Sequence, residues 1–159
     1  MPSEFNRIHY KEVTSTNDLC REEQKKSSVI TVVTADKQTQ GRGRNNKVWE
    51  SPHGNVSFSF GFTSSKLIHG LSVKTGLTAA KTISKTLDKP VQLKWPNDLI
   101  FQSKKIGGIL VEAENVGKKF ILVIGVGVNF SIKAKENHWG DLNIDSYELK
   151  ERFISNLIQ

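Results

Sequence analysis

The chain has 159 residues, of which 36% are hydrophobic and 25% are charged, and its formal net charge is +7. This length suits one domain with a substantial core, the composition excludes a disordered chain, and the positive charge favours an anionic partner such as a nucleotide, a nucleic acid, a membrane surface or an acidic protein. Cys20 alone cannot form an internal disulfide and is interpreted as a structural thiol, and no apolar run reaches about 18 residues, so we expect a cytoplasmic protein without a membrane span.

The first predicted elements are a short strand over residues 7–13 and a helix that ends near Lys26. Hydroxyl and amide side chains at residues 15–17 can accept hydrogen bonds from the free N–H groups at the start of that helix. A β-branched stretch over residues 29–35 then predicts a buried strand. On local grounds alone, residues 15–17 only cap the helix, and Gln38 is a loop amide after the strand.

The stretch from residue 41 to residue 55 is too long for a tight turn and too polar for a core. Gly41 and Gly43 lack a Cβ, so the backbone there can bend sharply and approach a ligand closely. Arg42 and Arg44 alternate with these glycines, and each guanidinium offers a planar set of donors to an anion. Loops of this length inside a compact domain are typical of functional segments, and a mobile basic surface loop is the alternative.

Five strands are predicted after this loop. Residues 55–62 alternate between apolar and small side chains, which predicts a strand with one row of phenylalanines in the core. Trp95 is also expected in the core, and the pair Gly107 and Gly108 predicts a bulge or a ligand pressed against the backbone. The remaining strands are expected over residues 91–95, 99–101, 106–112 and 120–128.

Two further helices complete the expected secondary structure. The first covers residues 67–87, is weakened by Gly76, and is expected to present one apolar face. That face consists of Leu71, Leu77, Ala80, Ile83 and Leu87. The second follows a capping box over residues 145–148, and its apolar stripe consists of Leu149, Phe153 and Leu157.

Four motifs occur in a specific order along the chain. They are GRGR at residues 41–44 followed by W-x-S-P-x-G-N, KWPND at residues 94–98, K-x-x-G-I-L at residues 105–110, and GVGVN at residues 125–129. In this order, from about residue 8 to residue 130, they resemble the catalytic domain of biotin protein ligases, also called biotin–[acetyl-CoA-carboxylase] ligases.

The resemblance implies an α+β fold, with a mixed, largely antiparallel β-sheet and helices packed on one face. It implies a single catalytic domain over residues 1–159. Many relatives carry an N-terminal DNA-binding domain or a C-terminal β-barrel domain, and neither is expected here, so no specific DNA binding is expected. Bacterial relatives often form homodimers, and a homodimer is an expectation that the resemblance carries.

The resemblance also implies an activity. The carboxylate of biotin would react with ATP to form biotinyl-5'-adenylate, and biotin would then pass to a lysine of the biotin carboxyl carrier protein of acetyl-CoA carboxylase. Mg²⁺ would accompany the phosphates, and no protein metal ligands are expected. Cations near the reacting anions fit this chemistry, because like charges about 4 Å apart cost about 4 kcal/mol at an effective dielectric constant of about 20.

By resemblance, Arg42 and the adjoining backbone close over biotin and the adenylate phosphate, and Arg44 retains the intermediate. Lys105 reaches the biotin carboxylate and the α-phosphate, and Asp98 orients or deprotonates the incoming lysine. The residues implied in catalysis are Arg42, Arg44, Lys105 and Asp98. Those implied in biotin binding are Ser15, Thr16, Asn17, Gln38, Gly41, Arg42, Gly43, Arg44, Lys105, Gly108 and Leu110. Those implied in adenylate binding are Trp49, Asn97 and Asn129.

Three alternatives remain at this stage. The first is a lipoate or octanoate ligase on the same fold, which the GRGR and KWPND motifs fit less well. The second is a basic nucleic-acid-binding module that uses Arg42, Arg44, Lys47 and Trp49 on phosphates and bases. The third is a non-catalytic biotin-binding regulator, which would bind biotin without exchanging pyrophosphate.

Overall fold

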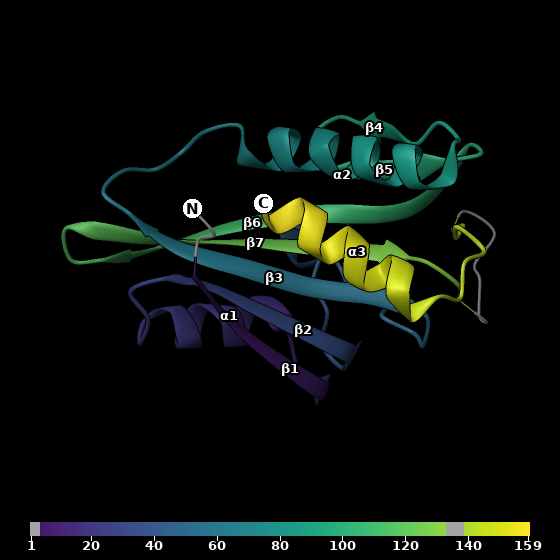
Figure 1. Cartoon of the computed structure of the whole chain (residues 1–159). Helices are drawn as coiled ribbons and strands as arrows, with labels where there is room; N and C mark the ends of the chain where they lie inside the picture. The colour runs from purple at the N-terminus through teal and green to yellow at the C-terminus, as the bar shows by residue number, and fades with distance from the viewer. Residues whose placement is uncertain (1–3, 133–138) are drawn as a thin grey trace.

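The computed structural model describes residues 4–132 and 139–159, and its framework is a seven-stranded sheet (Figure 1). The strand order is β1-β2-β3-β7-β6-β5-β4, in which β1 and β2 are parallel and the other neighbours antiparallel. The strands are β1 (Phe5–Val13), β2 (Ile30–Gln38), β3 (Asn55–Ser64), β4 (Gln92–Lys94), β5 (Asp98–Phe101), β6 (Lys104–Val116) and β7 (Lys119–Asn129). The helices are α1 (Thr16–Gln24), α2 (Leu71–Leu87), α3 (Tyr147–Ile158) and the short 3-10 turn η1 (Arg44–Asn46). The predicted α+β class with a mixed, largely antiparallel sheet is confirmed.

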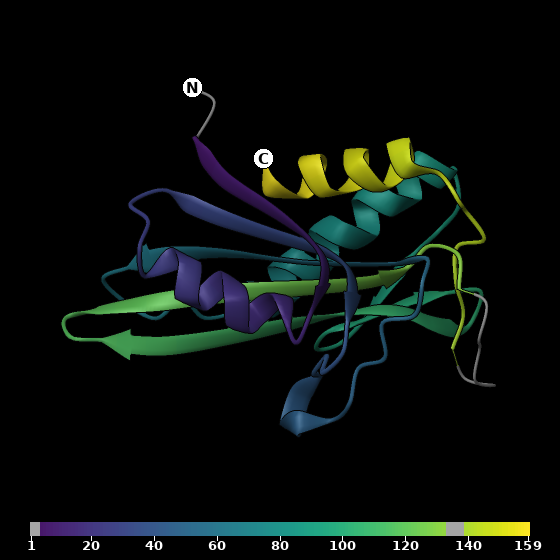
Figure 2. The same ribbon diagram turned by 90° about the horizontal axis from the view of Figure 1, so that it is seen from below.

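Helices cover both faces of the sheet (Figures 1 and 2), and β3 shows why. Its even-numbered side chains face α2 and α3, and the Phe58 and Phe153 rings meet edge to face with 6.0 Å between their centroids. Its odd-numbered side chains are small, so α1 can lie close on the other face, where a Cβ at Gly61 would be 3.0 Å from the Cys20 sulfur. The expectation of helices on one face is therefore right for α2 and α3 and wrong for α1.

The phenylalanine row of β3 is confirmed as core. Phe58 is fully buried, and Phe60 and Phe62 are partly buried against the same cluster. Burying a phenylalanine side chain contributes about 1.5–3 kcal/mol, so this row anchors α2 and α3 to the sheet.

Helix α2 begins at Leu71 rather than at residue 67, and its buried face differs from the predicted one. Leu77 is 47% exposed, whereas Ala80 and Ile83 are buried as expected. The reason lies at Gly76, where a Cβ would be only 2.6 Å from a methyl carbon of Leu93. Small side chains therefore bring the helix close to β4, and this packing turns Leu77 outward.

Within the described ranges, no helix has both the length and the apolar character needed to cross a membrane.

The prediction that Trp95 lies in the core is wrong, because the side chain is 77% exposed. Trp95 follows β4, which is the outermost strand of the sheet and only three residues long, so no neighbouring strand covers it.

The hairpin after β5 turns at Gln102 and Ser103, and β6 then continues through both of its glycines. The β5–β6 register shifts beside Gly107, which agrees with the predicted bulge.

Helix α3 buries Phe153 and Leu157 and half-buries Leu149, as its apolar stripe predicts. Its N-cap is Ser146, whose hydroxyl accepts a hydrogen bond from the Leu149 N–H at 3.3 Å. The predicted capping box placed this cap one residue earlier. The hydroxyl of Ser146 reaches the backbone N–H three residues on, which is the geometry an N-cap requires.

Candidate functional site

A cavity of about 450 Å³ opens between α1, the β5–β7 end of the sheet and the loop over residues 39–54. The loop carries η1 and projects away from the sheet on the side opposite α3 (Figure 2). The lining residues from α1, β2 and the loop are Ser15, Thr16, Asn17, Gln38, Arg42, Gly43, Arg44, Asn45, Lys47, Val48 and Trp49. Those from the rest of the chain are Pro96, Asn97, Asp98, Lys105, Gly108, Ile109, Leu110, Gly125, Val126, Gly127 and Trp139.

The polar end of the cavity is built from the first turn of α1 and the end of β2. The Thr16 backbone N–H and hydroxyl both donate to the side-chain carbonyl oxygen of Gln38, at 2.8 Å and 3.1 Å. The Ser59 hydroxyl donates to the side-chain carbonyl oxygen of Asn17, and the side-chain amide of Asn17 donates to the Glu112 carboxylate at 2.7 Å. Thr16, Asn17 and Ser59 are buried and Gln38 and Glu112 are partly buried, so their hydrogen bonds hold each donor and acceptor in a fixed direction.

Two local interpretations of these residues change. Ser15 is the N-cap of α1, yet it also lines the cavity, so capping and a place in the site are compatible. Gln38 ends β2 rather than lying in a loop, and its amide donates to Ser51 at 3.0 Å. The parallel β1–β2 pairing aligns Gln38 with Val13, which lies two residues before Ser15.

The loop is tied to itself beside the cavity. The backbone N–H of Trp49 donates to the Gly41 carbonyl at 2.8 Å, and Arg42 forms an antiparallel β-bridge with Val48. A Cβ at Gly41 would be 2.4 Å from the Trp49 carbonyl oxygen, whereas one at Gly43 would meet nothing closer than 3.6 Å. Position 41 therefore requires glycine because its backbone lies close to the Trp49 backbone of the same loop, not because it approaches a ligand.

Trp49 covers one side of the cavity. Its indole lies directly on β7, where a Cβ at Gly127 would be 2.8 Å from Nε1. The ring lies 6.4 Å from the Trp139 ring, and the Lys105 ammonium is 5.6 Å from its centroid. The indole N–H is buried, and within the described ranges it has no hydrogen-bond partner. An aromatic wall with a cation beside it can hold an apolar ligand that ends in an anion.

Arg42 reaches the cavity from the loop and is held by two carboxylates. Its NH1 and NH2 donate to the two Asp18 oxygens at 2.7 Å and 2.9 Å, and NH2 also lies 3.0 Å and 3.1 Å from the two Glu112 oxygens. Hydrogen bonds from Arg42 are the main cause that lowers the pKa of Asp18, and the hydrogen bond to Asp18 is the main cause that raises the pKa of Arg42.

The other two predicted cations differ from Arg42. The Lys105 ammonium pairs with Asp98 at 2.9 Å, and both side chains are about two-thirds buried. Arg44 is exposed, and no ion pair joins it to a residue of the described ranges. The cavity therefore holds Arg42 and Lys105 in compensated pairs and leaves Arg44 as a cation that faces solvent.

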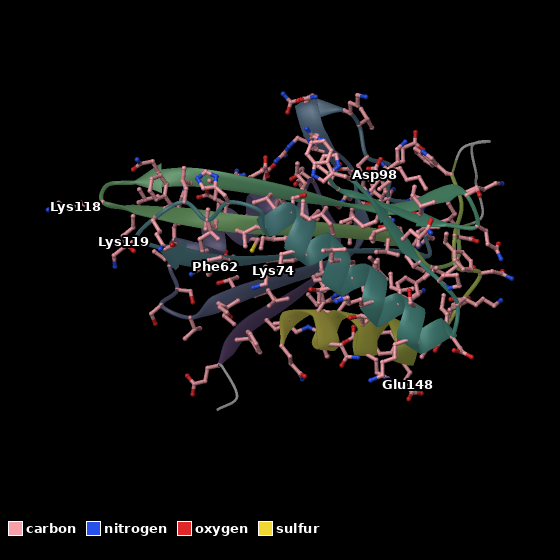
Figure 3. All side chains as sticks on the ribbon, turned by 90° about the horizontal axis from the view of Figure 1, so that it is seen from above. Phe62, Lys74, Asp98, Lys118, Lys119 and Glu148 are labelled. Atoms are coloured by element: carbon pink, nitrogen blue, oxygen red, sulfur yellow. The ribbon has the colours of Figure 1, made fainter. Side chains whose placement is uncertain are left out.

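Asp98 and the loop lie on the same side of the molecule in Figure 3, far from the hairpin tip that Lys118 and Lys119 mark. Asn97 precedes Asp98 and is fixed to β6. Its side-chain amide donates to the Ile109 backbone carbonyl at 3.0 Å, and its backbone carbonyl accepts from the Ile109 N–H at 3.0 Å.

Two predicted site residues lie outside the lining. Gly41 packs against Gln38 and Trp49 behind the cavity wall. Asn129 is buried, accepts a hydrogen bond from the Asn55 amide at 2.7 Å, and donates to the Gly140 carbonyl at 3.1 Å. The other predicted biotin, adenylate and catalytic residues all line the cavity.

Sequence reasoning missed several residues of the site. Glu112 comes two residues after the K-x-x-G-I-L motif, and its contact with Arg42 spans 70 positions, so no local pattern predicts it. Gly125 and Gly127 were recognised as a motif but not as cavity residues, although their alternation places both on the α1 face of β7. Trp139 lies beyond every motif and gave no signal.

Comparisons with known proteins agree on the kind of protein that this chain resembles. A sequence model of the biotin/lipoate A/B protein ligase family matches residues 9–129. Biotin–protein ligase 2 of Arabidopsis thaliana is 33% identical over 125 residues, which cover 74% of this chain and 38% of that protein. The chain spans well under half the length of the curated relatives it matches.

Solved structures give the same result. The biotin protein ligase of Aquifex aeolicus in complex with biotin and ATP has a TM-score of 0.74 and 30% identity, over 96% of this chain and 70% of that one. The biotin protein ligase of Leishmania major in complex with biotinyl-5-AMP has a TM-score of 0.74 and 27% identity, over 99% of this chain and 71% of that one.

Proposed function

This chain belongs to the biotin/lipoate A/B protein ligase family, and from that premise we propose that it joins biotin to a lysine of a carrier protein, with biotinyl-5'-adenylate as the intermediate. One observation carries the proposal: Arg42 and Arg44 from the loop and Lys105 from the distant strand β6 border the same cavity, beside Trp49. Relatives have been solved with biotin, ATP and biotinyl-5-AMP, which supports these ligands here.

The proposed first step transfers the adenylyl group of ATP to the carboxylate of biotin. A carboxylate oxygen of biotin attacks the α-phosphorus of ATP, the bond from that phosphorus to the bridging oxygen breaks, and pyrophosphate leaves. Both reactants are anions, and like charges about 4 Å apart cost about 4 kcal/mol at an effective dielectric constant of about 20. Positioned cations offset that repulsion, so placement and charge carry most of the step.

Lys105 is the cation proposed to act at the reacting centre. Its ammonium lies 2.9 Å from Asp98 and 5.6 Å from the centroid of Trp49. A biotin carboxylate or an α-phosphate can replace the carboxylate of Asp98 at the ammonium, since all are oxygen anions of similar size. Asp98, once released, is proposed to orient or deprotonate the incoming lysine amine.

Biotin is proposed to place its ureido group against the polar end of the cavity. Thr16, Asn17 and Gln38 there present hydroxyl and amide groups, which can donate to the urea carbonyl and accept from its N–H groups. Arg44 is proposed to close over the adenylate, and Asn97 to lie near the adenine. Asn129, whose amide is already hydrogen-bonded on both sides, would support this end from behind.

In the second proposed step the lysine nitrogen attacks the carbonyl carbon of the adenylate, AMP leaves, and the amine loses a proton. The carrier is proposed to be the biotin carboxyl carrier protein of acetyl-CoA carboxylase. Mg²⁺ is proposed to enter with ATP on the phosphate oxygens.

Biotin-dependent exchange of labelled pyrophosphate into ATP tests the first step. We expect exchange in the parent protein, and a reduction of about 100-fold, or about 2.7 kcal/mol of transition-state stabilisation, in both Lys105→Ala and Arg42→Ala. Lys104→Ala is the matched control, because Lys104 is the exposed neighbour of Lys105 and does not line the cavity. Equal rates in the three variants would refute the proposed roles.

The alternatives separate in the same assay. A lipoate or octanoate ligase exchanges pyrophosphate only with a fatty acid or lipoate, whose tail has no urea to meet the amides of Asn17 and Gln38. A non-catalytic regulator binds biotin without exchange. Oligonucleotide binding is disfavoured by the carboxylates that already hold Arg42, and it would show a steep dependence on salt.

A further inference from the structure

Glu112 lies at the crossing point of three elements around the cavity. It belongs to β6, and its carboxylate meets the guanidinium of Arg42 from the loop and that of Arg21 from α1. It also accepts a hydrogen bond from the Asn17 amide at 2.7 Å. The side chain of Glu112 is about three-quarters buried, so water screens these contacts only partly.

The hydrogen bonds of Arg42 leave some of the N–H donors of its guanidinium free. NH1 donates to Asp18, and NH2 donates to both Asp18 and Glu112. A guanidinium has five N–H groups, so one on NH1 and the one on Nε remain after these bonds. The two carboxylates thus fix the plane of the guanidinium without using all of its donors.

The charges of this group balance. Arg21 and Arg42 face Asp18 and Glu112, and Arg21 lies within 3.1 Å of both carboxylates. An arginine whose charge is offset in this way has less tendency to move toward solvent, while a ligand can still use its free donors.

We propose that Glu112 is a positioning residue, which holds the Arg42 guanidinium at the cavity and the Asn17 amide on its floor, and so links the loop to the biotin end of the site. The consequence for catalysis rests on the proposed function. The link itself is a property of the unliganded protein.

Glu114 provides a matched control. It lies two residues along β6 on the same face, and it pairs with Lys25 at 3.0 Å and with Arg21 at 3.6 Å. It forms no ion pair or hydrogen bond with Arg42 or Asn17. Each of the variants Glu114→Gln and Glu112→Gln therefore removes one negative charge from β6 and weakens an ion pair with α1. Only Glu112→Gln also weakens an ion pair with the loop.

The first measurement is hydrogen–deuterium exchange of the protein without ligand. We expect Glu112→Gln to speed exchange of the amides at residues 42–49 by about fivefold or more, with exchange in α3 unchanged. Glu114→Gln is expected to match the parent. Asp18→Asn serves as a second variant, and it should loosen the loop as well. Equal loop exchange in Glu112→Gln and Glu114→Gln overturns the proposal.

The second measurement is a double-mutant cycle on pyrophosphate exchange. Glu112→Gln should lower kcat about tenfold in the parent background and less than about twofold in the Arg42→Ala background, because its effect on kcat passes through that arginine, whereas its contact with Asn17 acts on biotin binding. Independent, additive effects would overturn the proposal. A parent protein without exchange activity would refute the proposed function alone, and the loop measurement would still decide the role of Glu112.

Discussion

At the scale of single residues, the cavity depends on positions where a side chain is missing. A Cβ at Gly125 would be 2.3 Å from the Asn17 carbonyl oxygen, and one at Gly127 would be 2.8 Å from the Trp49 nitrogen. These two glycines leave β7 flat where α1 and the loop press on it. The polar floor and the aromatic wall of the cavity therefore both rest on bare backbone.

We predict that Gly125→Ala weakens biotin binding about tenfold and lowers the free energy of unfolding by roughly 1–3 kcal/mol. The added methyl group would push Asn17 away from Ser59 and Glu112, both of which it contacts. Calorimetric titration with biotin and chemical denaturation measure the two effects. The Asn17→Ala background makes room for the methyl group, so a cost there as large as in the parent would contradict this explanation.

The ion pair between Asp18 and Arg42 predicts a dependence of stability on pH. Arg42 lowers the pKa of Asp18 in the folded protein, so Asp18 contributes stability in full above its unfolded pKa of about 4, and this stability is lost as the pH falls through the folded pKa. Thermal unfolding of the parent and of Asp18→Asn should thus differ by a constant amount from pH 7 to about pH 5 and converge below about pH 4. A constant gap down to pH 3 would count against the assignment.

At the scale of elements, serine hydroxyls begin two of the helices. Ser15 accepts from the Asp18 N–H at the start of α1, and Ser146 accepts from the Leu149 N–H at the start of α3. The first cap sits at the cavity and the second far from it. Only the second therefore reports on helix stability without disturbing the site.

We predict that Ser146→Ala lowers the free energy of unfolding by about 1 kcal/mol, because one N–H at the start of α3 loses its acceptor. Asp145→Ala is the control: Asp145 is exposed and makes only a 3.4 Å pair with Lys150, so its loss should cost less than about 0.5 kcal/mol. Urea denaturation distinguishes the two variants. A larger loss of unfolding free energy in Asp145→Ala than in Ser146→Ala would instead favour Asp145 as the cap, as the sequence predicted.

At the scale of the whole molecule, the sheet gathers segments that are far apart in the chain. The β3–β7 pairing sets Asn55 opposite Asn129, and the β6–β7 pairing sets Gly108 opposite Gly127. The first turn of α1 and the loop over residues 39–54 then cover that end of the sheet. An acyl adenylate hydrolyses in water, so a covering loop has a protective purpose in the proposed reaction.

We predict that biotin together with ATP slows hydrogen exchange across residues 41–49, because the proposed ligands give Arg42, Arg44 and Trp49 new partners. Exchange in α2, which does not line the cavity, should not change. ATP without biotin is the control for a loose electrostatic contact with Arg44. Unchanged exchange at residues 41–49 with both ligands would refute a covering role for the loop.

Sequence alone determined the features that depend on local pattern or on a motif. The alternation of β3, the capping residues of α1, the apolar stripe of α3, and the motifs that carry Arg42, Lys105 and Asp98 are all local in the chain, although the predicted cap of α3 was one residue too early. Tertiary structure alone decided the features that depend on which surfaces meet. It turned Leu77 and Trp95 outward, placed α1 on the second face of the sheet, and brought Glu112 to Arg42. A side chain's own chemistry can be read in the chain, but its neighbour across a sheet is set by packing.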